Sequence, residues 1–101
     1  MNDTVKNLIS LAESGDEKAQ TELGICYIKG DGVELDLKKA VLWWQKAAGR
    51  NYAEAQYYLG LCYVNGSGIE KNNEKAKELW TKAAENGNKK AKTKLKYLIG
   101  I

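Results

Sequence analysis

Residues that could carry out chemistry are few in this chain of 101 residues. It contains no histidine and two cysteines, Cys26 and Cys62. Without imidazole the chain lacks a Ser/His/Asp triad, a Cys/His nucleophile pair and any zinc site that needs histidine, and two thiols are too few for a four-cysteine site. Carboxylates such as Glu13, Glu22 and Glu54 are scattered, and nothing in the sequence places two of them in one apolar pocket. We therefore predict a protein that is not an enzyme and has no metal or cofactor.

Two glycine-rich segments deserve comparison with phosphate-binding loops. They read Gly30-Asp31-Gly32-Val33 and Gly66-Ser67-Gly68-Ile69. Both lack the third glycine of a dinucleotide-binding fingerprint and the Gly-Lys-Ser/Thr of a P-loop, and no strand-like run precedes either. Two glycines two residues apart also permit a tight chain reversal, after which Val33 or Ile69 would fold back as an apolar plug. We interpret both segments as structural turns.

Positive charge is concentrated toward the C-terminus. The chain has sixteen Lys and Arg against thirteen Asp and Glu, whereas residues 69–101 alone hold nine Lys and four Glu. Five of these lysines lie in the run 89–96. Such a run is usually the solvated face of a helix, here a capping helix, and an acidic protein partner is the second interpretation. Because the run has no interleaved aromatic residues and the pI is about 8.8, we expect no nucleic-acid partner.

An internal repeat of 36 residues sets the elements that must position these side chains. Residues 23–33 read LGICYIKGDGV and residues 59–69 read LGLCYVNGSGI, and the register continues until Trp44 aligns with Trp80. A period of this length with turn glycines in register is typical of stacked repeat proteins. The repeat signature is Leu23, Gly24, Tyr27, Gly30, Gly32, Ala40, Trp44 and Ala47 in the first copy, and Leu59, Gly60, Tyr63, Gly66, Gly68, Ala76, Trp80 and Ala83 in the second.

Each copy predicts two helices. Apolar residues recur at i, i+3, i+4 and i+7 from Ala40, and at i, i+4 and i+8 from Ala19, which are the spacings of one helix face. Gly15, Asn51 and Gly87 align, and these residue types favour a left-handed turn that ends a helix. The expected N-caps are Asp16, Asp36, Asn72 and Asn88. The expected helices cover residues 3–14, 17–29, 36–49, 53–65, 72–86 and 89–98.

The signature residues also predict how the helices pack. Gly24 and Gly60 lie inside helices, where glycine costs about 1 kcal/mol relative to alanine. We interpret them as points where a neighbouring helix closely approaches the backbone, and we expect Trp44 and Trp80 to fill the wider gap between layers.

These residues resemble a known family, the Sel-one-like repeat (SLR) family. The resemblance rests on Ala19-x3-Leu23-Gly24-x2-Tyr27-x2-Gly30-x-Gly32-Val33 and on the following tryptophan segment, and on the same pattern in the second copy. It implies an all-α fold, an α/α right-handed superhelix built as a short solenoid of about three helix pairs and related to tetratricopeptide repeats. We accordingly divide the single domain, residues 1–101, into an N-terminal half-unit 1–18, full repeats 19–54 and 55–88, and a C-terminal half-unit 89–101.

Cysteine usage departs from the secreted members of that family, which bridge the two helices of a unit with paired cysteines. The positions near Ala48 and Ala55 hold alanine here. Cys26 and Cys62 are equivalent residues of neighbouring units, and packed helix axes lie about 8–10 Å apart, whereas a disulfide needs Cα atoms within about 7 Å. We predict two free, buried thiols. Together with the absence of a leader-like start and of an apolar run near the roughly 18 residues of a membrane span, this predicts a cytoplasmic protein with no membrane partner.

The resemblance implies that the glycine-segment helices line the inner face of the solenoid. We take Ala19, Leu23 and Tyr27 as the side of the helix that packs in the core. The opposite, exposed side of these helices would then form a groove for a protein or peptide. Ile25 and Leu61 fall on the same arc, where we favour packing against the adjacent unit. The predicted partner-binding residues are Thr21, Ile28, Lys29, Tyr57, Val64, Asn65, Thr93 and Tyr97.

Function is predicted from this arrangement. The leading hypothesis is a non-enzymatic interaction scaffold or adaptor whose concave helical groove binds a peptide or protein partner. The alternatives are a structural or idealised repeat unit that self-associates without a separate ligand, and, by resemblance to bacterial SLR proteins, a small inhibitor or immunity-type protein of a bacterial toxin. The apolar end, residues 97–101, would fold back on the last unit, pair with a second copy as a homo-oligomer, or belong to a longer array.

Overall fold

A computed structural model describes residues 3–100 of the chain. Within that range it has six helices and no strand. Each expected helix is present, and its bounds agree with the expectation to within one residue, so the predicted all-α fold is confirmed. The helices are α1 (Asp3–Glu13), α2 (Glu17–Lys29), α3 (Leu37–Gly49), α4 (Ala53–Asn65), α5 (Asn73–Glu85) and α6 (Lys89–Ile99).

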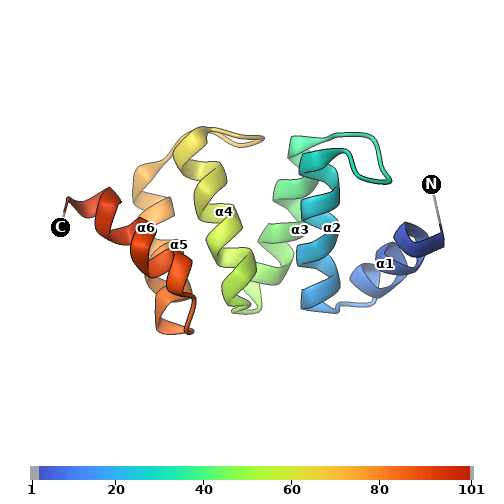
Figure 1. The fold of residues 1–101 in the computed structure, drawn as a ribbon, viewed down its shortest axis with the longest axis horizontal. Helices are drawn as coiled ribbons and strands as arrows, with labels where there is room; N and C mark the ends of the chain where they lie inside the picture. The colour runs from blue at the N-terminus through green and yellow to red at the C-terminus, as the bar shows by residue number, and fades with distance from the viewer. Residues whose placement is uncertain (1–2, 101) are drawn as a thin grey trace.

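The helices stack in sequence order into an elongated body of 45 × 23 × 17 Å. Each packs chiefly against its neighbours along the chain. Figure 1 shows α2, α4 and α6 side by side on the face nearest the viewer, with α3 and α5 behind them and α1 at the N-terminal end. The first helices of successive pairs therefore share one face of the molecule, and α3 and α5 separate them at the back.

Helix boundaries follow the capping residues. The side chains of Asp16, Asp36, Asn72 and Asn88 each accept a hydrogen bond from the backbone N–H three residues on. Helix α4 has Tyr52 at its N-cap position, and this residue makes no side-chain cap hydrogen bond. The three aligned turn positions all have positive φ, at 102° for Gly15, 67° for Asn51 and 91° for Gly87. The left-handed turns predicted at these three places are confirmed.

The core is organised by a tryptophan seated against a glycine, once in each repeat. The indole N–H of Trp44 donates to the Thr21 carbonyl at 2.9 Å, and that of Trp80 donates to the Tyr57 carbonyl at 3.0 Å. Both rings are buried. A Cβ added at Gly24 or Gly60 would overlap the Trp44 or Trp80 indole. The close approach at these glycines is therefore made by the tryptophan side chain, where a neighbouring helix was expected. Trp44 also stacks on Tyr58 of α4, so it fills space between successive units as expected.

The glycine-rich loops are structural turns, as predicted. Gly30 and Gly66 end α2 and α4 in the left-handed region, each with φ of 68°. The N–H groups of Gly30 and Asp31 both donate to the Cys26 carbonyl. In the second copy the N–H groups of Gly66 and Ser67 donate to the Cys62 carbonyl. These amides are used to end the helices and do not point at a ligand. Gly68 lies so close to the Leu37 carbonyl that a side chain would overlap it, so the second loop packs on the start of α3.

The C-terminal helix folds back on the last full repeat. Leu95 and Leu98 pack against the cluster around Trp80, whereas Tyr97 is 82% exposed. Lys96 of α6 is the counterpart of Gly24 and Gly60. Helix α6 therefore lacks the tryptophan seat, by which we mean the side-chain-free glycine position against which an indole packs in α2 and α4. The part of the apolar end that falls on Ile101 lies outside the described residues.

Because the glycine admits an indole, a Gly24→Ala substitution should destabilise the fold even though alanine is the better helix former. We expect a loss of about 2–4 kcal/mol from overpacking and from the displaced hydrogen bond. Gly49→Ala is the control, because Gly49 is also helical and has no atom near its missing Cβ; it should leave stability unchanged or raise it by up to ~1 kcal/mol. Urea unfolding measures both free energies of unfolding. Equal effects of the two substitutions would contradict the close contact between Gly24 and the Trp44 indole.

The two adjacent tryptophans of α3 should contribute unequally to stability. Trp44 is buried and hydrogen-bonded, so Trp44→Ala should cost about 3–5 kcal/mol. Trp43 is half-buried with the Lys46 ammonium 4.6 Å from its ring centroid, so Trp43→Ala should cost clearly less. Thermal unfolding of the two variants checks the order, and the reverse order would be inconsistent with the packing described.

Candidate functional site

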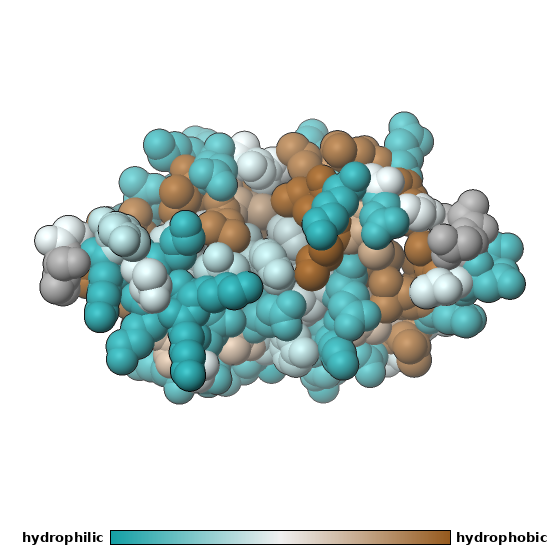
Figure 2. Space-filling view, viewed as in Figure 1, coloured by the Kyte–Doolittle hydropathy of each residue, from teal (hydrophilic) through white to brown (hydrophobic). Residues whose placement is uncertain are grey.

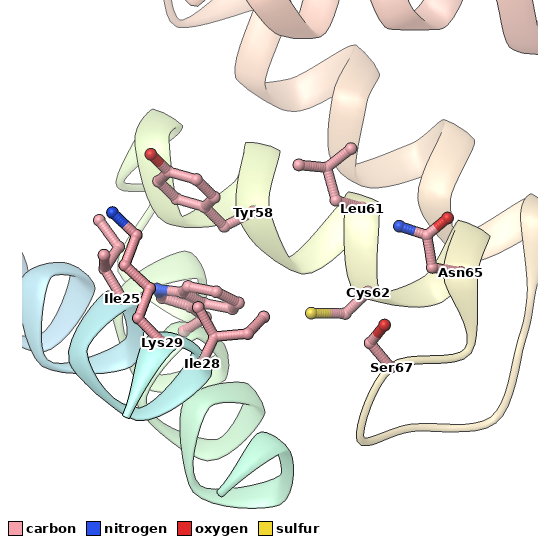
Figure 3. A pocket seen from close by; sticks show the side chains of 9 residues that line it. Ile25, Ile28, Lys29, Tyr58, Leu61, Cys62, Asn65 and Ser67 are labelled. Carbon is pink, nitrogen blue, oxygen red and sulfur yellow. The ribbon is translucent and has the colours of Figure 1, made fainter. Parts of the chain in front are cut away.

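A cavity of about 320 Å³ opens between α2 and α4. Figure 3 shows side chains converging on it from α2, from α4 and from the loop that follows α4. Its lining is Ile25, Ile28, Lys29, Trp44, Tyr58, Leu61, Cys62, Asn65 and Ser67. We call this the α2–α4 cavity. Both α2 and α4 pack chiefly on α3, which leaves space between their outer edges.

The inside of this cavity is apolar and its rim is polar. Trp44 and Tyr58 stack with ring centroids 5.0 Å apart and an interplanar angle of 14°. The Cys62 thiol points from α4 toward α2 into the space, as Figure 3 shows. Lys29 and Asn65 are exposed. An apolar side chain could therefore enter while polar backbone groups meet the amide and the ammonium.

A second cavity, of about 350 Å³, lies between α4 and α6. We call it the α4–α6 cavity. Each of its lining residues is the 36-residue counterpart of a residue that lines the first, so the repeat produces the same cavity twice. The lining is Leu61, Val64, Asn65, Trp80, Lys94, Tyr97 and Leu98.

The two cavities lie on either side of α4, and we call them together the groove. Leu61 and Asn65 line both, so α4 supplies the wall between them. Figure 2 shows the surface that carries this groove: hydrophobic side chains gather over the α2 side and hydrophilic ones over α6. Between the cavities the largest chemical changes are from Tyr58 to Lys94, from Lys29 to Asn65 and from Leu61 to Tyr97.

Five of the residues predicted for partner binding lie in this groove. Ile28 and Lys29 line the α2–α4 cavity, Val64 and Tyr97 line the α4–α6 cavity, and Asn65 lines both. Their common position is brought about by the shared face of α2, α4 and α6. That these residues bind a partner stays a prediction.

Thr21 and Tyr57 do not lie on the exposed stripe where the sequence analysis expected them. Thr21 is 1% exposed and its hydroxyl donates to the Glu17 carbonyl, and Tyr57 is 9% exposed and packs with Trp80. The expectation assumed one buried face per helix. Each of α2 and α4 is instead packed between two helices, and its buried residues cover more than half of its circumference.

Thr93 is exposed on α6, where its hydroxyl donates to the Lys89 carbonyl, and it lines neither cavity. Sequence reasoning missed Tyr58 as a groove residue and favoured simple packing for Ile25 and Leu61, all three of which line the α2–α4 cavity. For Ile25 and Leu61 the signal is the repeat itself, because positions 25, 61 and 97 are equivalent and Tyr97 is predicted for the groove. The counterparts of Tyr58 are Glu22 and Lys94, so the repeat gives no such signal for Tyr58.

Other kinds of site are not evident in the described part of the chain. No three His, Cys, Asp or Glu residues within 3–100 are grouped so that they could hold a metal ion. Among the same residues no helix combines the length and the apolar character that crossing a bilayer requires.

Comparison with known proteins identifies the fold. The family model of the Sel1 repeat matches residues 17–52 and 53–88, which is most of the chain. The chain belongs to the Sel1 repeat family. Sel1 repeats are generally a non-catalytic helical fold for protein–protein interaction. A comparison with curated proteins gave no match.

Solved structures of Sel1 repeat proteins superpose closely on the chain. A Sel1 repeat protein from Oxalobacter formigenes is 40% identical with a TM-score of 0.90, over 94% of this chain and 73% of that one. The protective antigen c5321 of uropathogenic Escherichia coli, with an SLR fold, is 38% identical with a TM-score of 0.90; the match covers 96% of this chain but 21% of that protein. Cysteine-rich protein B of Helicobacter pylori is 29% identical with a TM-score of 0.83, over 90% and 70%.

The two thiols of this Sel1 repeat chain are free, as predicted. Cys62 is 2% exposed, whereas Cys26 is only half-buried, so the expectation of two buried thiols is correct for Cys62 alone. Burial raises the pKa of the Cys62 thiol from 9.0 to about 11. The pKa of Cys26 is also raised, mainly by burial and then by the Asp31 and Glu22 carboxylates.

The raised pKa predicts an unreactive Cys62 in the folded protein. In a Cys26→Ser variant, iodoacetamide at pH 8 should alkylate Cys62 at least ~100-fold more slowly than in the unfolded chain, because the thiolate is the reacting form. Mass spectrometry of timed samples measures the rates, and comparable rates would contradict the buried position.

The same pKa shift predicts the direction of a pH effect on stability. Since the folded state holds the Cys62 proton more tightly than the unfolded state, this contribution is complete below about pH 9 and is lost as the pH rises toward 11. The decline should be smaller in Cys62→Ser, measured by urea unfolding across that range.

Proposed function

We propose that the chain is a non-enzymatic adaptor that holds a peptide segment of a partner protein in the groove between α2, α4 and α6. The observation that carries the proposal is the duplication of one apolar cavity along one face. A single hollow is common on any protein surface, but two equivalent cavities in line suit a ligand that is itself a chain and presents successive side chains.

The character of the lining supports a peptide over a small polar ligand. Aromatic and aliphatic groups from Trp44, Tyr58 and Leu61 supply contact area, and the exposed amide of Asn65 stands between the cavities. The Tyr58 hydroxyl can donate a hydrogen bond to a ligand, as any tyrosine can at neutral pH. Burial and the Glu54 carboxylate raise its pKa further. Buried aromatic anchors beside a polar rim are the usual composition of binding hot spots.

The free thiols support a further part of the proposal, that the protein works in a reducing compartment such as the cytoplasm. In an oxidising compartment the half-buried Cys26 would be available for pairing with other thiols.

The groove is tested by placing a charge inside it. Peptides enriched by the protein from a random library displayed on phage should bind Ile28→Glu at least about tenfold more weakly than the wild type, because the substitution places an ion in the apolar α2–α4 cavity. The matched control is Leu42→Glu, at a leucine of α3 that is 56% exposed and lines neither cavity. Fluorescence anisotropy of labelled peptides gives the affinities, with circular dichroism as the check on folding.

Ser67→Trp tests the same cavity by filling it without adding charge. Ser67 lies in the loop after α4 and lines the cavity, so an indole there should occupy the space and also weaken the peptides. No enrichment by the wild type, or equal affinity for the wild type and both groove variants, would contradict the proposed function. A stable oligomer in light scattering that persists in both variants, without peptide binding, would instead support self-association.

A further inference from the structure

The groove has a uniform sign of charge. The chain carries thirteen acidic residues, yet of the described residues that line the α2–α4 and α4–α6 cavities none is acidic. Two are lysines, Lys29 in the first cavity and Lys94 in the second. Both lysines are exposed, and among residues 3–100 neither has a carboxylate within salt-bridge distance, so their charges are available to a ligand.

Charge also differs between the two cavities. The position that holds Tyr58 against Trp44 in the α2–α4 cavity holds Lys94 in the α4–α6 cavity, whereas the third equivalent residue, Glu22, lines neither cavity. Helix α6 adds Lys89, Lys90, Lys92 and Lys96 around Lys94, which makes this end the positive end of the molecule. Lys29 lies at the exposed rim of the α2–α4 cavity, whose interior is formed by the stacked Trp44 and Tyr58, so this cavity suits an apolar side chain. In the α4–α6 cavity Lys94 takes the place of Tyr58, so this cavity suits an anionic side chain.

Building on the proposed function, we infer that the groove selects acidic peptides in one register, with an aromatic or aliphatic side chain in the α2–α4 cavity and an Asp or Glu carboxylate at Lys94. The two cavities lie on either side of α4, and a helix with its side chains is about 10–12 Å across, so the two binding positions are on the order of 10 Å apart. An extended peptide rises about 3.3 Å per residue, so the acid should lie about three residues from the apolar anchor.

The test uses the peptides enriched by the wild-type chain and replaces the peptide acid by its amide. On the wild type this replacement should weaken binding about tenfold. On Lys94→Gln it should change the affinity less than about twofold, because the lysine that meets the carboxylate is gone. The matched control is Lys92→Gln, which removes a lysine from the opposite side of the same helix and lines neither cavity, and on which the full tenfold effect should remain.

The outcomes separate this inference from the proposed function. Enriched peptides without an acid about three residues from an apolar residue would overturn it, and so would an acid-to-amide effect that persists on Lys94→Gln. Equal losses on Lys94→Gln and Lys92→Gln would also overturn it, since they would mean attraction to the positive end as a whole. In each case, peptides that still depend on Ile28 would leave the peptide-binding groove in place, whereas binding that is indifferent to Ile28→Glu would remove both.

Discussion

The indoles of Trp44 and Trp80 reach their backbone acceptors only because residues 24 and 60 have no side chain. This contact fixes the second helix of each pair against the first in distance and in register, since a hydrogen bond from a rigid ring to one carbonyl allows little sliding. It also makes the groove. The ring that fills the glycine notch in α2 or α4 presents its other side between successive helices, where Trp44 and Trp80 line the two cavities.

Repetition and variation are divided between the layers of the molecule. The tryptophans and the glycines that receive them keep their residue type from copy to copy. Even peripheral contacts recur: Lys39 lies over the Tyr27 ring and Lys75 over the Tyr63 ring, at 5.5 and 5.7 Å from the ring centroids. Positions that line the groove change, most sharply from Tyr58 to Lys94. A shared scaffold with differing linings is the arrangement expected where packing is held constant and ligand preference is set locally.

The sequence was sufficient for the helices because their limits are decided locally. Capping side chains and positive-φ turn residues act within a few residues of a helix boundary. Residues such as Asp36 and Asn51 therefore predict the local structure whatever the rest of the chain does. The groove was only partly predictable because exposure depends on how many neighbours a helix has. A periodicity that marks one buried face cannot distinguish a helix with one neighbour from a helix packed between two, and Thr21 and Tyr57 lie in the arc that the second neighbour covers.

The two cavities do not share the same mechanical support. Helix α4 is held between α3 and α5, and it contacts Trp44 of α3 and Trp80 of α5. The described contacts of α6 are chiefly with α5. Lys96 at the glycine position means that α6 contributes no tryptophan seat of its own. In a linear stack the stability of each element is approximately its own stability plus that of its interfaces, so α6 opens at lower free energy than α4. A ligand that spans both cavities must therefore order the α6 wall at some entropic cost. The electrostatic attraction of the lysine-rich helix is well placed to offset this cost, because it acts at a distance, before the wall is closed.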